Sequence, residues 1–170
     1  MIRMLGGALI LFGCGMCGCL AANSLGKRVS TVRGMLSAVR TMRQELAFSL
    51  LPTPRLLERL AEKSDGDLKR FFSGCIQRLD RLEEASLDES WNAELAQVRW
   101  TGKEKEMRAF QQLGYVLGRY DREGQEGSFA AVEETLACCL AEAEEERRTM
   151  GRVYRTVGFT AGGFLLILLL

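Results

Sequence analysis

The stretch VSTVRGMLSAVRTMRQELAFSL, residues 29–50, carries an apolar residue at nearly every third or fourth position. These positions are Val29, Val32, Leu36, Val39, Met42, Leu46 and Leu50. Residues three and four apart lie on the same side of an α-helix, so this near-heptad spacing is typical of a helix with one buried face. It predicts a long amphipathic helix whose apolar stripe needs partner helices to cover it.

The chain after this stretch continues in helical patterns. Pro52 ends the first helix, and Thr53 followed by Pro54 supplies the cap and the first residue of a second helix. Ser64-Asp65-Gly66 has the composition of a turn and separates the second helix from a third. The apolar positions of these two helices are Leu56, Leu57, Leu60 and Ala61, then Leu68, Phe71, Phe72, Cys75, Ile76, Leu79 and Leu82.

Capping boxes predict two further helix starts. In Ser86-x-x-Glu89 and Thr101-x-x-Glu104, a hydroxyl residue is followed three positions later by a glutamate, as in boxes that satisfy the first amides of a helix. Asp121 can cap a last helix, which we expect to run unbroken through Met150 and Tyr154. The apolar positions of these helices are Trp91, Leu95 and Val98; Met107, Phe110, Leu113 and Leu117; and Phe129, Val132, Leu136, Cys139, Leu140 and Ala143.

The sequence predicts an all-α fold. No segment alternates apolar and polar residues over the length of a strand, and the 170 residues include two prolines. We expect a compact bundle of about six helices in residues 27–155, a length sufficient for one core. The first and last helices of this bundle continue into the two ends of the chain.

Both ends of the chain are free of charge. Residues 4–26 and 156–170 contain no charged side chain, and all charged residues except Arg3 lie between these runs. As helices the runs would be about 34 Å and about 22 Å long, against about 30 Å for a bilayer core. We predict a transmembrane helix in 1–26 and a hydrophobic anchor in 156–170, lengthened by Arg155 reaching toward the interface.

Cationic side chains predict the orientation of these segments. Lys27, Arg28 and Arg33 follow the first run, and Arg147, Arg148, Arg152 and Arg155 precede the second. Because Lys and Arg favour the cytoplasmic side of a membrane, we expect the bundle to lie in the cytoplasm.

The N-terminus has two other interpretations. Arg3, the apolar run and Ala21-Ala22 resemble a cleavable signal peptide, and Leu11-Phe12-Gly13-Cys14 loosely resembles a lipoprotein cleavage site. Cleavage before Cys14 would leave an exported lipoprotein with its domain outside the cell. An anchored, uncleaved N-terminus is the interpretation that we prefer, because Phe12 is bulky for such a site.

Glycine and cysteine spacing indicates helix packing. Cys14-x-x-Cys17-x-Cys19 has the spacing of metal ligands, but it lies in an apolar run, and the chain has no histidine. Small residues in such a run favour close approach of helices, as Gly158 and Gly162 do in the second run. Gly114 and Gly118 stand four apart within a predicted helix, where we expect a close helix crossing. The sequence predicts no metal and no cofactor.

Two charged faces have two possible roles. Lys27, Arg28, Arg33, Arg40 and Arg43 come with no acid among them, while the last helix has an acidic set. Its members are Glu133, Glu134, Glu142, Glu144, Glu145 and Glu146. The faces can be solvated and pair with each other, or one of them can dock a charged partner or anionic headgroups.

Catalysis and nucleic-acid binding find little support. Histidine, the commonest acid–base residue, is absent, and there is no phosphate-binding loop and no G-x-S-x-G. Glu45 stands on a largely apolar face, where we expect an ion pair with an arginine of another helix rather than a general base. A formal net charge of +1 does not favour a nucleic-acid partner. We predict that the chain is not an enzyme; a small membrane-bound enzyme of unknown substrate is the alternative.

The residues carry a resemblance to a known family. Leu113-Gly114-x-x-Leu117-Gly118-x-x-Asp121-Arg122-Glu123-Gly124-Gln125 resembles the signature of the stage III sporulation protein AB family. The proline corner Leu51-Pro52-Thr53-Pro54, and Tyr154-Arg155-x-x-Gly158 before a leucine-rich tail, are similar to that family too. The resemblance covers essentially the whole chain.

The resemblance implies a place in a membrane complex. Members of this family belong to the channel complex between mother cell and forespore in endospore formation. Their domain resembles the helical cytoplasmic domain of the inner-membrane platform protein of type II secretion machines. The resemblance therefore implies a scaffold in the mother-cell membrane that faces the forespore. This scaffold would link a cytoplasmic secretion-type ATPase to the channel. Other channel proteins would be partners, and the chain could form an oligomer.

One corner is the candidate partner surface. Asp121, Arg122, Glu123 and Gln125 stand at the junction of two helices, where polar residues can contact a partner while nearby leucines serve the core. The alternative is that Asp121 only caps the last helix.

Overall fold

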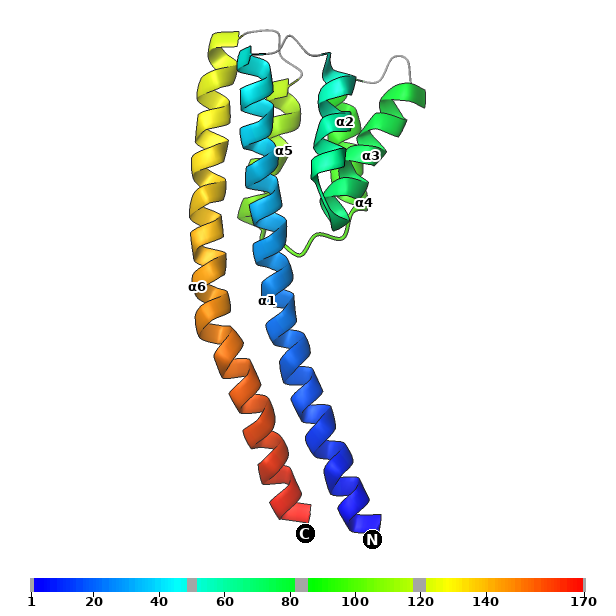
Figure 1. Ribbon diagram of the computed structural model, residues 1–170, viewed down its shortest axis with the longest axis vertical. Coiled ribbons are helices and arrows are strands. Elements are labelled where there is room, and N and C mark those ends of the chain that lie inside the picture. Colours follow the sequence, from blue (N-terminus) through cyan, green and yellow to red (C-terminus); the bar gives the residue numbers. More distant parts are fainter. Residues whose placement is uncertain (1, 49–51, 82–85, 118–121, 170) are drawn as a thin grey trace. The chain divides into compact units, whose positions relative to one another are not determined.

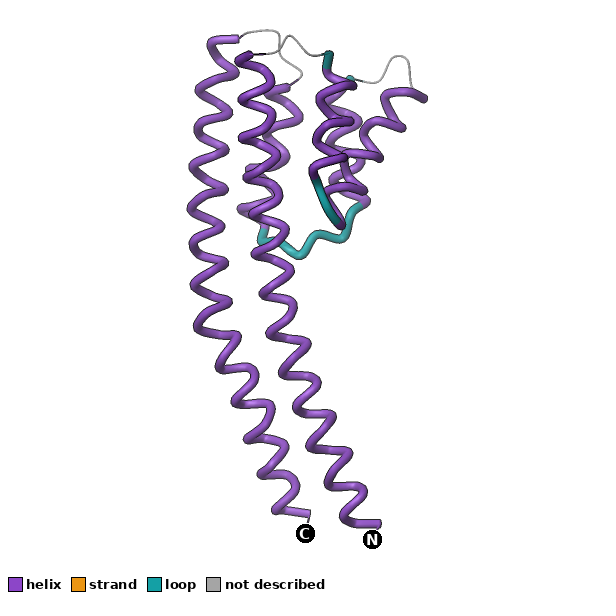
Figure 2. The backbone as a smooth tube through the Cα atoms, viewed as in Figure 1, coloured by secondary structure: helices purple, strands orange, loops and turns teal. Residues whose placement is uncertain are grey.

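The computed structural model describes the backbone of residues 2–48, 52–81, 86–117 and 122–169. In these ranges the chain forms six α-helices and no strand (Figures 1 and 2). They are α1 Ile2–Phe48, α2 Thr53–Lys63, α3 Gly66–Arg81, α4 Leu87–Gln97, α5 Glu104–Leu117 and α6 Arg122–Leu169. The predicted all-α class and the number of helices are confirmed.

The helices divide into two compact units. Unit 1 consists of residues 1–29 and 141–170, and unit 2 consists of residues 30–140. The long helices α1 and α6 each contribute one part to both units. Unit 2 adds the four short helices, in which α2 packs on α3, α3 on α4 and α4 on α5 (Figure 1). Neighbours in sequence are therefore neighbours in space.

The core of unit 2 follows the predicted stripes. Val32, Leu36, Val39 and Met42 of α1 are buried, and so are all four predicted positions of α2. On the other helices of unit 2, the predicted residues that are buried are Leu68, Phe71, Phe72, Cys75, Trp91, Phe110, Leu113, Phe129, Val132, Leu136 and Cys139. The predicted Ala143, which belongs to unit 1, is buried as well. The buried face of α1 also includes Met35 and Ala38, which the near-heptad stripe omitted.

One predicted stripe position was wrong. Leu46 is exposed, at 36% of its surface. A straight helix with 3.6 residues per turn drifts by about 20° per heptad against a strict seven-residue repeat, so a stripe extended over two heptads rotates off the buried face. Leu50, the next position, lies outside the described residues, as does Leu82 of the third stripe.

An aromatic cluster forms the centre of unit 2. The ring of Phe71 lies 4.7 Å from that of Trp91 and 5.4 Å from that of Phe110, centroid to centroid. Phe72 and Trp100 join the same cluster. The Trp91 ring stands edge-on to Phe71, at 86°, an orientation that favours aromatic contact. The cluster connects α3, α4 and α5, which lie consecutively in the sequence.

Helix starts agree with the predicted boxes at one place and differ at another. The hydroxyl of Ser86 accepts a hydrogen bond from the backbone N–H of Glu89, as predicted. The predicted Thr101-x-x-Glu104 box was wrong, because α5 begins at Glu104 and the carboxylate of Glu106 accepts from the backbone N–H of Lys103, at 2.8 Å. A side chain on Gly102 would come within 2.8 Å of that carboxylate, so glycine leaves the room that Glu106 uses.

The second helix starts one residue earlier than expected. Pro52, and not Thr53, occupies the N-cap position, and Pro54 lies in the first turn, where its missing N–H is not needed. The predicted turn before α3 is present: Gly66 has a φ of +57°, a left-handed value that glycine adopts without strain.

Unit 1 pairs the two ends of the chain as helices. As predicted, α6 runs without a break past Met150 and Tyr154 to Leu169, and α1 starts at Ile2. Among the described residues, no helix has a stretch long and apolar enough to cross a membrane. Most residues of the predicted anchors, 1–26 and 156–170, have side chains that the structure does not describe.

Candidate functional site

The predicted partner corner lies at the edge of what the structure describes. Asp121 and Gly118 lie outside the described residues. The backbone of Arg122, Glu123 and Gln125 forms the first turn of α6, but their side chains are not among those described. Gly158 and Gly162 lie within α6, but the structure does not describe what surrounds them. The corner therefore remains a prediction.

The described surface nearest to the corner in sequence contains a large aromatic residue. Tyr115, near the end of α5, is 54% exposed, whereas its neighbours Gly114 and Val116 are buried. Exposed tyrosine on a rigid helix is a frequent anchor at protein interfaces, because its flat ring loses little conformational freedom on binding. Tyr115 was not among the candidates that the sequence singled out.

Gly114 lies against the indole of Trp91. A Cβ atom added at Gly114 would come within 2.6 Å of the Trp91 side chain, closer than real side chains approach. The indole N–H of Trp91 donates to the backbone carbonyl of Phe110, one turn earlier on α5, at 3.1 Å. The indole therefore lies along α5 at the level of Gly114, and the glycine provides the space that it fills.

The basic and acidic faces of the long helices meet within unit 2. Arg40 and Arg43 of α1 contact the two carboxylate oxygens of Glu133 on α6, at 2.8 Å and 2.7 Å. The Glu133 side chain is 21% exposed, and the arginines are about half exposed. This observation supports the interpretation that the two faces pair with each other, and it fixes α1 against α6 at this level.

Glu45 forms the ion pair that the sequence predicted. Its carboxylate accepts from Arg59 of α2 at 2.6 Å, and the Glu45 side chain is 15% exposed. Because Arg59 is half exposed, water screens the pair and its net contribution is modest. The contact holds the end of α1 against α2, so a structural role accounts for this carboxylate.

A second ion pair lies close to a cysteine of the core, Cys75. Glu94 of α4 accepts from Arg78 of α3 at 2.8 Å, with 14% of the Glu94 side chain exposed. Gly74 makes room for it, since a Cβ there would come within 2.3 Å of the carboxylate. Burial, reinforced by the charge of Glu94 and partly offset by Arg78, raises the pKa of the neighbouring Cys75 to about 12. The thiol stays protonated and unreactive at neutral pH.

This thiol predicts how stability depends on pH. The ordinary pKa of a cysteine is near 9, so between about pH 9 and about pH 12 the unfolded chain loses the Cys75 proton while the folded chain keeps it. Stability should fall as pH rises through that window. Urea unfolding at about pH 8 and about pH 11, with reductant present, should show a steeper loss for the native chain than for Cys75→Ala. Equal losses in both proteins would show that the thiol does not contribute.

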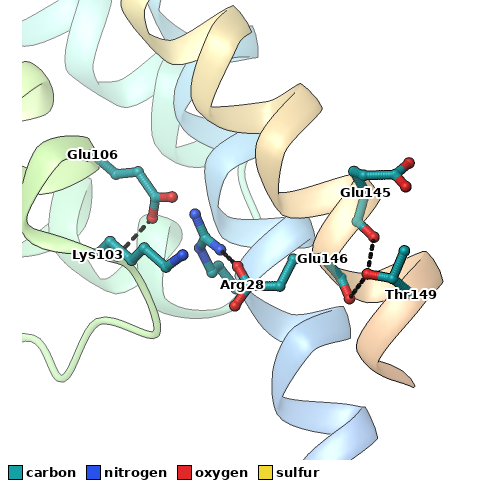
Figure 3. A network of polar contacts seen from close by, with 6 residues as sticks. All are labelled: Arg28, Lys103, Glu106, Glu145, Glu146 and Thr149. Carbon is teal, nitrogen blue, oxygen red and sulfur yellow. Dashed lines mark hydrogen bonds and ion pairs between the residues drawn. The ribbon is translucent and has the colours of Figure 1, made fainter. Parts of the chain in front are cut away.

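Unit 1 has its own buried charge. Arg28 of α1 donates to the carboxylate of Glu146 on α6 (Figure 3). The Arg28 side chain is only 8% exposed. On the same turn of α6, the Thr149 hydroxyl donates to the backbone carbonyls of Glu145 and Glu146. Because the Arg28 side chain is nearly buried, its contact with Glu146 holds α1 against α6 within unit 1.

The chemistry of these sites is that of packing and pairing. Among the described residues, no three His, Cys, Asp or Glu side chains gather as they would around a metal ion. The described half-buried carboxylates Glu45, Glu94 and Glu133 each face an arginine. These arrangements hold helices together.

Comparison with known proteins gives the family. The sequence matches the family described as stage III sporulation protein AB over residues 3–170. The chain belongs to the stage III sporulation protein AB family. A member of this family, stage III sporulation protein AB of Bacillus subtilis (strain 168), is 24% identical over 173 residues, which cover 100% of both chains.

A solved structure has the same fold as this chain. Stage III sporulation protein AB (SpoIIIAB) superposes with a TM-score of 0.65 at 20% identity, covering 72% of this chain and 98% of that chain. At this identity the likeness shows the fold. Membership confirms the resemblance that the residues predicted and gives the chain a role in sporulation. The family description names no enzymatic activity.

Proposed function

We propose that this member of the stage III sporulation protein AB family is a non-enzymatic membrane platform of the channel complex between mother cell and forespore. In this role it links a cytoplasmic secretion-type ATPase to the channel. The observation that carries the proposal is the continuity of α1 and α6 from the helical bundle into the uncharged ends of the chain. Family membership supports the sporulation role, and the pairing of the described charges supports a scaffold.

The platform has two parts in this proposal. The uncharged runs, 4–26 and 156–170, anchor the chain in the mother-cell membrane that faces the forespore. The bundle of unit 2 lies in the cytoplasm, because the cationic residues flank both runs on its side. There it presents the corner between α5 and α6 to the ATPase or to another channel protein.

Substitutions in the proposed partner surface should impair assembly. Exchanging the charges in Arg122→Glu with Glu123→Arg should leave the fold intact but reduce co-purification of the ATPase from sporulating membranes, and reduce spore yield. Tyr115→Ala should weaken the same association by about tenfold or more, as loss of an interface anchor does. Co-purification is measured from detergent-solubilised membranes with a tag on this chain.

A matched control is available on α2. Glu62 and Lys63 are a neighbouring acid and base, both exposed, at the end of that helix. Glu62→Lys with Lys63→Glu makes the same exchange of charges away from the corner, and it should assemble normally. If the corner variant folds, assembles and sporulates like this control, the corner is structural and Asp121 is only a cap.

Topology separates the platform from the exported alternative. Single cysteines at Lys103 and Gln125, in a chain without its own six cysteines, should resist a membrane-impermeant thiol reagent in intact cells. Both should react after the cells are permeabilised. Ready labelling in intact cells would overturn the cytoplasmic orientation and favour a lipoprotein, whose mature N-terminus at Cys14 can be identified by mass.

A further inference from the structure

Three arginines line a hollow in unit 1. It has a volume of about 300 Å³ and is bounded by Ala22 of α1 and by Arg147, Arg148, Gly151, Arg152 and Thr156 of α6. The two smallest of these residues, Ala22 and Gly151, leave the space open. The described lining residues contribute three guanidinium groups and no carboxylate.

Two nearby acids, Glu145 and Glu146, do not neutralise this lining. Glu146 faces Arg28 instead of the hollow, in the buried pair described above. Glu145 lies 3.4 Å from Arg148, but both side chains are more than half exposed, so water weakens this contact. Arg147 and Arg152 are also exposed. The hollow is a site of positive charge that a small anion can enter.

The donors suit a phosphate group. A guanidinium presents several N–H groups in a planar fork that matches two oxygens of a phosphate, and its charge is permanent at any physiological pH. The Thr156 hydroxyl donates its one hydrogen to the Arg152 carbonyl at 3.0 Å, so the arginines are the donors for an anion in the hollow. The volume is at the small end of ligand sites, which fits a headgroup and not a whole cofactor.

The position of the hollow indicates which phosphate it binds. Thr156 is the first residue of the uncharged run at the C-terminus, and Ala22 lies in the uncharged run at the N-terminus. Directly around the arginines, α6 exposes Val153, Tyr154 and Val157, at 48%, 43% and 55% of their surfaces. Arginine next to exposed apolar and aromatic side chains is the composition of a segment at the membrane–water interface, where lipid phosphates lie.

We propose that this arginine hollow binds the phosphate of an anionic phospholipid headgroup. The inference rests on the proposed membrane location, and it adds a specific lipid site between α1 and α6. A bound headgroup contacts both helices of unit 1, so the lipid holds the ends of the chain together at the membrane surface.

The test compares lipids on the purified full chain in a neutral detergent. Dioctanoyl phosphatidylglycerol, dioctanoyl phosphatidylcholine and inorganic phosphate are titrated separately, and bound species are counted by native mass spectrometry. Phosphatidylglycerol should bind one to one, at least about tenfold more tightly than phosphatidylcholine. Arg147→Gln with Arg152→Gln should remove that preference.

A control keeps the same change of charge elsewhere. Arg70→Gln with Arg81→Gln removes two exposed arginines of α3, and it should leave phosphatidylglycerol binding unchanged. The proposal is overturned if both double variants lose binding equally, since net charge then suffices. It is also overturned if phosphatidylcholine binds as tightly as phosphatidylglycerol. Inorganic phosphate that binds as tightly as phosphatidylglycerol overturns it too, since the hollow is then a site for free anions.

Membrane association is measured separately. The native chain and the arginine variant should both remain in the membrane fraction after extraction with alkaline carbonate. A native chain in the soluble fraction contradicts the proposed platform. A native chain in the membrane that shows no preference for phosphatidylglycerol contradicts only the lipid site.

Discussion

Replacing Trp91 by alanine should lower the free energy of unfolding by about 3–5 kcal/mol. The side chain is fully buried and stands at the centre of the aromatic cluster, with ring centroids of Phe71 and Phe110 at 4.7 Å and 5.1 Å. The change removes these contacts, leaves a cavity and deprives the Phe110 carbonyl of the indole hydrogen bond. Urea unfolding of the full chain measures the loss.

The second tryptophan serves as the reporter. Trp100 belongs to the same cluster, and its indole donates to the Leu95 carbonyl at 2.9 Å, so its fluorescence follows unfolding of unit 2. Trp91→Phe keeps an aromatic ring and gives up the hydrogen bond, and it should cost less than alanine does. A loss below about 1 kcal/mol for Trp91→Ala would mean that the cluster does not support the core.

Gly114→Leu should destabilise the chain by about 1–3 kcal/mol or more through overpacking. Even Gly114→Ala should destabilise it, although alanine is intrinsically about 1 kcal/mol better than glycine inside a helix. The reason is the distance of 2.6 Å between the added Cβ and the Trp91 ring atoms. The same urea unfolding measures both variants.

Gly127 is the matched control for this substitution. It is exposed on α6, and an added Cβ would meet nothing within 4 Å. Gly127→Ala should therefore leave stability unchanged or raise it by up to about 1 kcal/mol. The cost of Gly114→Ala should also shrink in a Trp91→Ala chain, because the two residues share one contact. A Gly114→Leu variant as stable as the native chain contradicts the close approach.

Periodicity was sufficient to predict the helices and most of the core. Apolar spacing at three and four residues located the buried faces of α1, α2 and α3, because burial of one face decides where amphipathic helices pack. The spacing could not tell how wide a face is, so Met35 and Ala38 were missed and Leu46 was wrongly included. Width depends on how many helices surround α1, and that is a property of the tertiary fold.

Polar contacts were harder to predict from the sequence. The pairing of Glu45 with an arginine was foreseen from its apolar neighbours, but its partner Arg59 was not. Glu106 was missed entirely, although it is fully buried at the start of α5, because a glutamate near a helix start is usually solvated. Gly102, four residues before Glu106, was a signal of this burial, because a glycine leaves space for the carboxylate. The corner at 121–125 stays a prediction.

The pairing of α1 with α6 in unit 2 determines when the core can close during synthesis. Glu133 lies 93 residues after Arg40 in the sequence, whereas α2, α3, α4 and α5 each pack on a neighbour in sequence. Contacts between sequence neighbours form early, and contacts across a long loop form late. While the ribosome is still translating the segment that becomes α6, the apolar stripe of α1 lacks this cover. The emerging chain therefore carries an exposed apolar, aggregation-prone surface until α6 has been made.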